Sequence, residues 1–342
     1  DLDRPDQLDP ETLGDYLDDF RSRFQSLRAQ IGEAIVGHDT LVDNALGAIF
    51  SQGHALIEGV PGLGKTYLVR IIAQALGLSF GRVQCTPDLM PADILGTHIL
   101  SEDESGHRSF RFDKGPVFKH LLLVDEINRA TPKTQAALLE VMQEKAVTAG
   151  GERHELPRPF FVLATQNPLE MEGTYPLPEA QLDRFLYKLR VTFPSVDELV
   201  EISNRTTGFD EPEVSEIMTG DELIGMQRLL SQVPVAEPLV RYASELIHAT
   251  HPDSEAAPKS VQRFVAYGAS PRGLQALIRG ARVHCVLENR TAVGIADLRA
   301  AAYPSLRHRM VLNFDGQAEN LDTDKLVDDV LAAVPEPAAA AA

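Results

Sequence analysis

The sequence predicts an α/β fold in which a parallel five-stranded sheet, sandwiched by helices, is followed by a small all-helical domain. Three observations lead to this expectation. Strand-like apolar runs alternate with helical patterns from about residue 54, a glycine-rich turn joins the first of these strands to a helix, and only helical patterns follow residue 194. Such alternation indicates a parallel sheet covered on both faces. Ligands of such sheets bind at the carboxyl ends of the strands.

Composition sets the broad limits. With 342 residues and 44% apolar content, the chain can bury the cores of about two domains. Its formal net charge of −18 argues against the basic footprint that nucleic-acid binding needs, although it leaves room for a local basic groove. Cys85 and Cys285 are too few for a disulfide framework and favour a reduced, cytoplasmic compartment. We expect no membrane span, since no apolar run approaches about 18 residues.

The N-terminal part predicts two helices. Residues 1–14 look like a disordered lead-in. Apolar residues then recur at helical spacing and predict a face that packs on the core: Tyr16, Phe20, Phe24, Leu27 and Ile31. A second helix, at about 39–51, precedes the first strand.

The alternating region that follows predicts five strands and four helices. Strands are expected near 54–58, 80–84, 120–124, 160–165 and 187–191. Helices are expected near 65–76, 132–145, 178–184 and 195–206.

Two segments interrupt the alternation. Between residues 96 and 115, the extended pieces 97–100 and 109–112 flank a polar, glycine-containing tip, which predicts a hairpin. Residues 147–159 predict a second hairpin just before a strand. Polar insertions of this kind often carry function.

Proline and acidic residues near 194 mark a junction, after which we expect helices at 221–232, 238–250, 271–290, 295–302 and 323–333. The expected organisation is therefore a disordered lead-in (1–14), an α/β nucleotide-binding domain (15–194), a helical lid domain (195–334) and a flexible tail (335–342).

The glycine-rich turn has the complete G-x-x-x-x-G-K-T spacing of a phosphate loop, and it lies between a strand and a helix as that motif requires. Such a turn directs backbone N–H groups and a helix N-terminus at a polyphosphate. Lys65 would reach the phosphate oxygens of ATP, and Thr66 would hold Mg²⁺. The expected nucleotide-binding residues are Gly59, Val60, Pro61, Gly62, Leu63, Gly64, Lys65, Thr66 and Tyr67.

A buried strand, 121–124, leads directly into two carboxylates. At the carboxyl end of a parallel strand, such a pair faces the phosphate-loop ligand. We expect Asp125 to hold Mg²⁺ and Glu126 to polarise the attacking water, as phosphoryl transfer to water requires. By itself the pair is also compatible with an ordinary strand followed by a helix cap, but the phosphate loop upstream favours the site.

Three further polar residues are candidates. Asn167 ends the strand at 160–165 and would orient the water if that strand lies beside the one carrying Asp125; on spacing alone, a turn-forming Asn before proline explains it equally well. Arg184 and Arg272 are candidate stabilisers of phosphate charge. A solvated surface arginine is the default alternative for each of the two.

Taken together, these residues resemble a MoxR-type AAA+ ATPase. The similarity spans about residues 30–310 and is carried by the phosphate loop and four longer blocks: Asp125–Ala130, Ala164–Pro168, Glu172–Phe185 and Gly268–Arg272. It implies that Lys65 and Thr66 are the Walker A residues and that Asp125 and Glu126 are Walker B. By the same resemblance, Asn167 is sensor 1, Arg184 is an arginine finger acting in trans and Arg272 is sensor 2. Gly64 stands where many members carry alanine.

The resemblance also implies an output. It predicts a homo-oligomeric ring, expected to be a hexamer, that remodels or matures a protein client, with metal or cofactor insertion as one form of that work, together with a von Willebrand factor A (VWA) domain partner. No D-x-S-x-S motif is obvious in this chain, so that partner would be a separate protein. A nucleic-acid motor related to replicative helicases and an ATP-dependent assembly scaffold are the alternatives. The acidic charge counts against the first and the intact Glu126 against the second. Whether sensor 2 acts in cis or in trans stays open.

Overall fold

The computed structural model describes residues 10–102, 108–168, 173–207, 212 and 214–337. Its centre is the predicted parallel five-stranded sheet, with strand order β2-β5-β8-β1-β9. These strands are β1 (Ala55–Glu58), β2 (Phe80–Gln84), β5 (Leu121–Asp125), β8 (Phe161–Gln166) and β9 (Tyr187–Arg190). Strand β5 is buried at every position because helices cover both faces of the sheet, which explains its continuous apolar sequence. The α/β fold expected from the sequence is confirmed.

Helices α1 (Pro10–Ala34) and α2 (Asp39–Phe50) precede the sheet. Residues 10–14, expected in the lead-in, are therefore helical, and residues 1–9 lie outside the described chain. The predicted core face of α1 is correct from Phe20 onward but wrong at Tyr16, which is 38% exposed, whereas Leu17 is fully buried. The rings of Phe20 and Phe50 lie 5.0 Å apart and join the two helices.

The remaining helices of the α/β part are α3 (Lys65–Ala75), α4 (Pro91–Leu95), α5 (Pro132–Glu144), α6 (Glu179–Leu182) and α7 (Val196–Thr206), with a 3-10 turn at Ile127–Arg129. Helix α6 is shorter than the predicted 178–184, and α4, with five residues, was not predicted. A helix this short has too few turns to show a sequence period.

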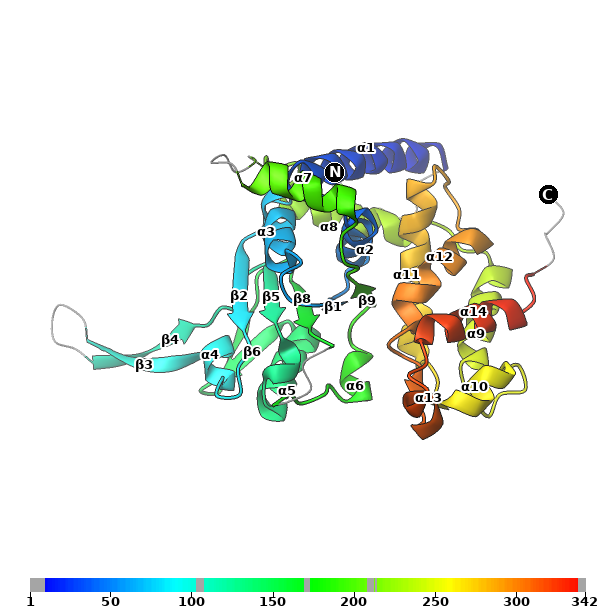
Figure 1. Ribbon diagram of the computed structural model, residues 1–342. Coiled ribbons are helices and arrows are strands. Elements are labelled where there is room, and N and C mark those ends of the chain that lie inside the picture. The colour runs from blue at the N-terminus through cyan, green and yellow to red at the C-terminus, as the bar shows by residue number, and fades with distance from the viewer. Residues whose placement is uncertain (1–9, 103–107, 169–172, 208–211, 213, 338–342) are drawn as a thin grey trace.

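Both hairpins are present. Strand β3 (Gly96–Glu102) pairs with β4 (Arg108–Lys114), and β6 (Ala146–Ala149) pairs with β7 (Glu152–Glu155); residues 103–107 lie outside the described chain. Figure 1 shows β3 and β4 extending from the body of the molecule as an arm. Phe112 of the arm stacks on His154 of the second hairpin with ring centroids 4.2 Å apart, so the two hairpins touch at the base of the arm.

The C-terminal part contains α8 (Gly220–Gln232), α9 (Glu237–Ala249), α10 (Lys259–Phe264), α11 (Pro271–Leu287), α12 (Ile295–Leu306), α13 (Phe314–Ala318) and α14 (Thr323–Ala333). The expectation of helices alone was wrong, because β10 (Val265–Tyr267) pairs with β11 (Val311–Leu312). Two strands of three and two residues are too short to show alternation in sequence. No helix of the described chain is long and apolar enough to cross a membrane.

Helices α7 and α8 lie within the range expected for the lid, yet they pack with the N-terminal helices. Arg205 of α7 donates to the carbonyl oxygens of Gly32 and Glu33, and Gln227 of α8 donates to that of Ile49. Figure 1 shows α9 to α14 gathered at the end of the molecule opposite the arm. We therefore propose that the lid begins at α9.

The lid packs closely against the sheet at Gly280 of α11. A Cβ atom at this position would lie 1.9 Å from the hydroxyl oxygen of Tyr187 on β9. Tyr187 is buried, and burial raises the pKa of its hydroxyl above the ordinary value. The missing side chain at Gly280 is thus what lets α11 rest on the edge of the sheet.

Candidate active site

The phosphate loop connects β1 to α3. Gly62 and Gly64 have φ values of 83° and 71°, in the left-handed region that favours glycine, and no atom crowds either position. Backbone conformation, rather than space, therefore requires these glycines. Nζ of Lys65 donates to the carbonyl oxygens of Gly59, at 2.5 Å, and Val60, at 3.2 Å. Burial lowers the pKa of Lys65, opposed by the nearby Asp125 and Glu126 carboxylates.

Asp125, at the carboxyl end of β5, joins three neighbouring elements. Its Oδ2 lies 3.3 Å from Oγ1 of Thr66 on α3 and 2.8 Å from Nη2 of Arg82 on β2. Its Oδ1 accepts a 2.6 Å hydrogen bond from Oγ1 of Thr165 on β8. The carboxylate is buried. The structure thus brings the two expected magnesium-binding side chains together.

Glu126 has a left-handed backbone, with φ 55° and ψ 51°. A residue with a side chain is uncommon there and is strained by about 1–2 kcal/mol. Oγ1 of Thr165 accepts the Glu126 backbone N–H at 2.9 Å, and the Glu126 carboxylate accepts from Gln84 at 3.0 Å and Arg129 at 3.2 Å. The fold therefore holds the strained carboxylate in place through both its backbone and its side chain.

These groups surround one cavity of about 380 Å³. Asn167 lines it and is itself buried, because β8 lies beside β5 with Ala164 opposite Val124. The two strands that carry Asp125 and Asn167 are thus neighbours, as the predicted role of Asn167 requires. Sequence reasoning missed three lining residues: Arg82, Gln84 and Thr165. Their only signal was polarity near the carboxyl ends of strands flanking β5.

The donor set at Asp125 fits Mg²⁺. A threonine hydroxyl and a carboxylate are hard oxygen donors, which this ion prefers, alongside phosphate oxygens of the nucleotide. The Arg82 guanidinium lies 2.8 Å from Oδ2 of Asp125, the oxygen that faces Thr66, which indicates that this oxygen attracts a cation. Thr66 and Asp125 would hold the ion there.

A second cavity, of about 270 Å³, adjoins the phosphate loop. Gly62, Leu63, Gly64 and Tyr67 line both cavities. Its other walls are largely apolar and come from residues 34–38, before α2, and from residues 193–206, at α7. A mostly apolar cleft next to a phosphate site is suited to a nucleotide base. This cleft could not be predicted from the sequence, because segments so far apart in the chain carry no common pattern.

Arg184 and Arg272 line a third cavity, of about 200 Å³. It shares no lining residue with the phosphate-loop cavity among the described residues. Nη1 of Arg184 donates to the carbonyl oxygen of Leu139 at 2.7 Å, while its Nε is buried without a hydrogen-bond partner in the described chain. The structure therefore brings the two arginines together, but away from the phosphate loop of their own chain.

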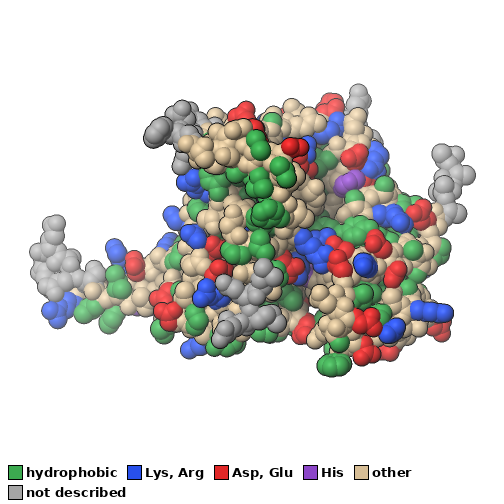
Figure 2. Space-filling model, in the orientation of Figure 1, with side chains coloured by type: hydrophobic (Ala, Val, Ile, Leu, Met, Phe, Trp, Pro, Cys, Tyr) green, Lys and Arg blue, Asp and Glu red, His purple; other side chains and the backbone are tan. Residues whose placement is uncertain are grey.

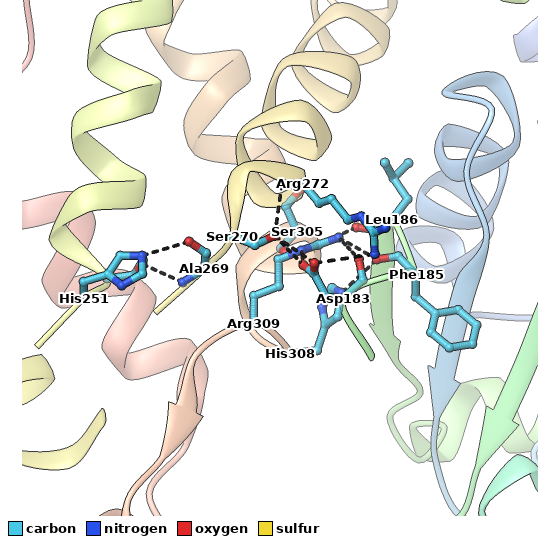
Figure 3. Close-up of polar contacts among 11 residues, drawn as sticks. Asp183, Phe185, Leu186, His251, Ala269, Ser270, Arg272, Ser305, His308 and Arg309 are labelled. Atoms are coloured by element: carbon cyan, nitrogen blue, oxygen red, sulfur yellow. Dashed lines mark hydrogen bonds and ion pairs between the residues drawn. The ribbon is translucent and has the colours of Figure 1, made fainter. Parts of the chain in front are cut away.

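Asp183 lies at the centre of the contacts around this third cavity (Figure 3). Its carboxylate accepts from Nε of Arg309 at 2.9 Å and from Oγ of Ser270 at 2.8 Å, and Nη1 of Arg272 lies 3.8 Å away. Burial lowers the pKa of Arg309, and the Asp183 charge opposes that shift. Residues 126 positions apart thus join the lid to the segment carrying Arg184.

Comparison with known proteins supports a nucleotide site. A family model described as "ATPase family associated with various cellular activities (AAA)" matches residues 54–187, and one described as "AAA lid domain" matches residues 258–330. Chaperone MoxR1 of Mycobacterium tuberculosis is 42% identical over 90% of this chain and 81% of its own length. Protein MoxR of Paracoccus denitrificans is 32% identical over 94% of this chain and 99% of its own. A solved structure from Cytophaga hutchinsonii superposes with a TM-score of 0.88 at 37% identity, covering 96% of this chain and 98% of its own.

Proposed function

This chain belongs to the MoxR family of AAA+ ATPases, and from that premise we propose that it works as a hexameric ring in which each ATP site is completed by arginines of the neighbouring copy. Family membership makes the chain a nucleotide-binding ATPase, as the sequence predicted. The ring, its size and the roles of individual residues are the proposal.

Within one chain, the phosphate-loop amides and Lys65 bind the phosphates, and the apolar cavity beside Tyr67 takes the base. Thr66 and Asp125 hold Mg²⁺, which supplies positive charge to the phosphate oxygens. Glu126 polarises the attacking water and Asn167 orients it, since both side chains line the cavity into which the phosphates extend. Oγ1 of Thr165 donates to the Asp125 carboxylate and accepts from the Glu126 backbone N–H, so Thr165 fixes the positions of these two residues relative to each other.

The observation that carries the proposal is the separation of the arginines from their own phosphate loop. Arg184 and Arg272 line one cavity, and Lys65, Asp125 and Glu126 line another. An arginine that stabilises the transferred phosphoryl group must reach it, either from its own chain or from a partner. We therefore assign both Arg184 and Arg272 to the nucleotide of the neighbouring copy, which would place sensor 2 in trans.

Mixing variants tests this assignment. Arg184→Ala and Glu126→Gln should each be inactive alone, because one lacks the arginine and the other the carboxylate. In an equal mixture, about a quarter of the interfaces of a head-to-tail ring pair an intact Glu126 with an intact Arg184. ATPase activity should therefore reappear. Absence of activity at every ratio, in rings shown by native mass spectrometry to be mixed, would remove Arg184 from the neighbour's site.

For the output, we propose chaperone-like remodelling or maturation of a protein client, including metal or cofactor insertion, together with a separate VWA-domain protein. The MoxR relatives support this, one of which is named a chaperone. The arm offers a contact surface: Leu100 and Phe110 face each other across β3 and β4 and are 57% and 76% exposed (Figure 2 shows the arm's hydrophobic side chains). Exposed apolar side chains of this size on a projecting element suit protein contact.

A double variant, Leu100→Ser with Phe110→Ser, should keep wild-type ATPase activity and lose the ability to suppress aggregation of a chemically unfolded test protein. Phe314→Ser is the matched control, since Phe314 is 82% exposed but lies on the lid. Equal suppression by the double variant and the wild type would remove the arm from client binding.

A further inference from the structure

The guanidinium of Arg309 uses every N–H group it has. Nε donates to the Asp183 carboxylate, Nη1 donates to the carbonyl oxygens of Leu186 and Ser305, and Nη2 donates to those of Asp183 and Phe185. Five donors in a fixed planar fork therefore meet five acceptors. Three of these acceptors are backbone carbonyls of the segment Asp183–Leu186, which contains Arg184. Nε2 of the adjacent His308 donates to Phe185 as well, at 3.0 Å.

A second lid element meets the same carboxylate. Ser270, the N-cap residue of α11, directs its hydroxyl at both oxygens of Asp183, at 2.9 and 2.8 Å. Two positions later on the same helix, Nη1 of Arg272 lies 3.8 Å from Oδ2. Asp183 is thus the one acidic side chain among the described residues lining this cavity, and it binds two separate parts of the lid.

We propose that Asp183 is a positioning residue that couples the lid to Arg184, so that the lid, Arg184 and Arg272 of one copy move as one body against the neighbour's nucleotide. This proposal rests on the function proposed above, in which Arg184 acts across the interface. Asp183 is not among the described residues that line the phosphate-loop cavity of its own chain. Its carboxylate fixes Arg309 and Ser270, and Arg309 in turn fixes the backbone on both sides of Arg184.

The contacts of Arg309 require the negative charge of Asp183. Asparagine has the same shape and keeps an oxygen acceptor, but it would leave the Arg309 guanidinium, whose side chain is 2% exposed, without a counter-charge. The segment around Arg184 would then lose its fixed position. Because a displacement of about 1 Å in a catalytic group can reduce a rate by about 100-fold, we expect kcat of Asp183→Asn to fall about 10- to 100-fold. Nucleotide affinity should stay at the wild-type value, since the phosphate loop is elsewhere.

Mixing the Asp183→Asn variant with other variants distinguishes a positioning role of Asp183 from a general loss of structure. Asp183→Asn mixed with Glu126→Gln should recover activity, because the Asp183→Asn copy supplies an intact Walker site and the Glu126→Gln copy supplies a well-placed Arg184. Asp183→Asn mixed with Arg184→Ala should not recover, because both copies lack a competent arginine. Arg307→Lys is the matched control: Arg307 also joins the lid to the sheet, donating to Asp324 and to the carbonyl oxygen of Lys188, but it does not contact the Arg184 segment. It should keep wild-type kcat.

Wild-type kcat in folded Asp183→Asn would overturn the proposal. So would a loss of activity that Glu126→Gln does not restore, in an experiment in which Arg184→Ala is restored. If Arg184→Ala itself is not restored, the function proposed above fails and this inference fails with it. Should Asp183→Asn not fold, Ser270→Gly serves instead, because glycine is nearly as good as serine at an N-cap, while the hydroxyl contact with Asp183 is lost. A smaller fall in kcat, again restored by Glu126→Gln, supports the proposal, and an unchanged kcat contradicts it.

Discussion

Nε of Arg309 lies 2.9 Å from Oδ1 of Asp183, in an ion pair between the lid and the segment that leads into β9. An ion pair at the surface contributes little to stability, but removing one partner of a buried pair costs about 3–5 kcal/mol. The exposed fractions of the two side chains, 2% and 19%, place this pair near the buried limit. We infer that the lid and the sheet do not unfold independently.

The Walker residues should separate binding from turnover. Lys65→Ala should lose measurable ATP binding, because Lys65 is the lysine of the phosphate loop and lines the cavity expected to hold the phosphates. Glu126→Gln should keep ATP affinity and lose turnover by about 100-fold or more, the usual contribution of a general base. Isothermal titration calorimetry and a phosphate-release assay measure the two quantities. Equal ATP affinity in Lys65→Ala and the wild type would remove the phosphate loop from the site.

Arg82 competes with a cation for Asp125, since its guanidinium lies 2.8 Å from the carboxylate oxygen nearest Thr66. Because the Arg82 side chain is 47% exposed, the pair contributes at most about 1 kcal/mol. Arg82→Gln should therefore raise the apparent affinity for Mg²⁺, in the presence of a fluorescent ATP analogue, by about 2- to 5-fold. A fall in that affinity would show instead that Arg82 contributes to phosphate binding.

Gly280→Ala should destabilise the protein. In the middle of an exposed helix, replacing glycine by alanine stabilises by about 0.5–1 kcal/mol. At Gly280 the added Cβ would lie 1.9 Å from the Tyr187 hydroxyl oxygen, so α11 or β9 must move. We expect a net loss of about 1–3 kcal/mol in the free energy of unfolding. Adding Tyr187→Phe, which removes the clashing oxygen, should restore part of that loss; no restoration in urea titrations would place the clash elsewhere.

His54 makes stability depend on pH. Its Nδ1 accepts from the Val162 N–H, its Nε2 donates to the Met142 carbonyl, and burial lowers its pKa from 6.5 to about 4. Above pH 6.5 the His54 ring is neutral in both the folded and the unfolded chain. As the pH falls from 6.5 towards 4, His54 becomes protonated in the unfolded chain but stays neutral in the folded chain. Stability should therefore decrease by up to about 3 kcal/mol across this window and level off below it.

His54→Gln, which retains one acceptor and one donor, should make that decrease smaller when urea midpoints are compared at about pH 7.5 and pH 5. The exposed His248→Gln should behave as the wild type does. Identical slopes in His54→Gln and the wild type would mean that other groups carry the pH dependence.

Much of this site could be predicted because its residues follow local rules. Gly62 and Gly64 of the phosphate loop are required by their backbone conformation, and Asp125 and Asn167 lie at the ends of strands that burial makes recognisably apolar. Arg82 was missed because a polar residue on a partly exposed edge strand has no distinctive pattern. Arg309 was missed for a different reason. Its five hydrogen bonds depend on how the lid packs, and nothing near it in sequence specifies that packing.

At Glu126, substitutions that relieve the backbone strain would also remove the side chain expected to act in catalysis. Asparagine and glycine enter the left-handed region more readily than glutamate, so either could relieve up to about 1 kcal/mol of strain at this position. A library selected only for thermal resistance would then be enriched in variants that lack the carboxylate expected to polarise the water. Directed evolution of this protein towards heat tolerance therefore needs an ATP-turnover screen at every round, because the stabilising substitutions would include some that abolish ATP hydrolysis.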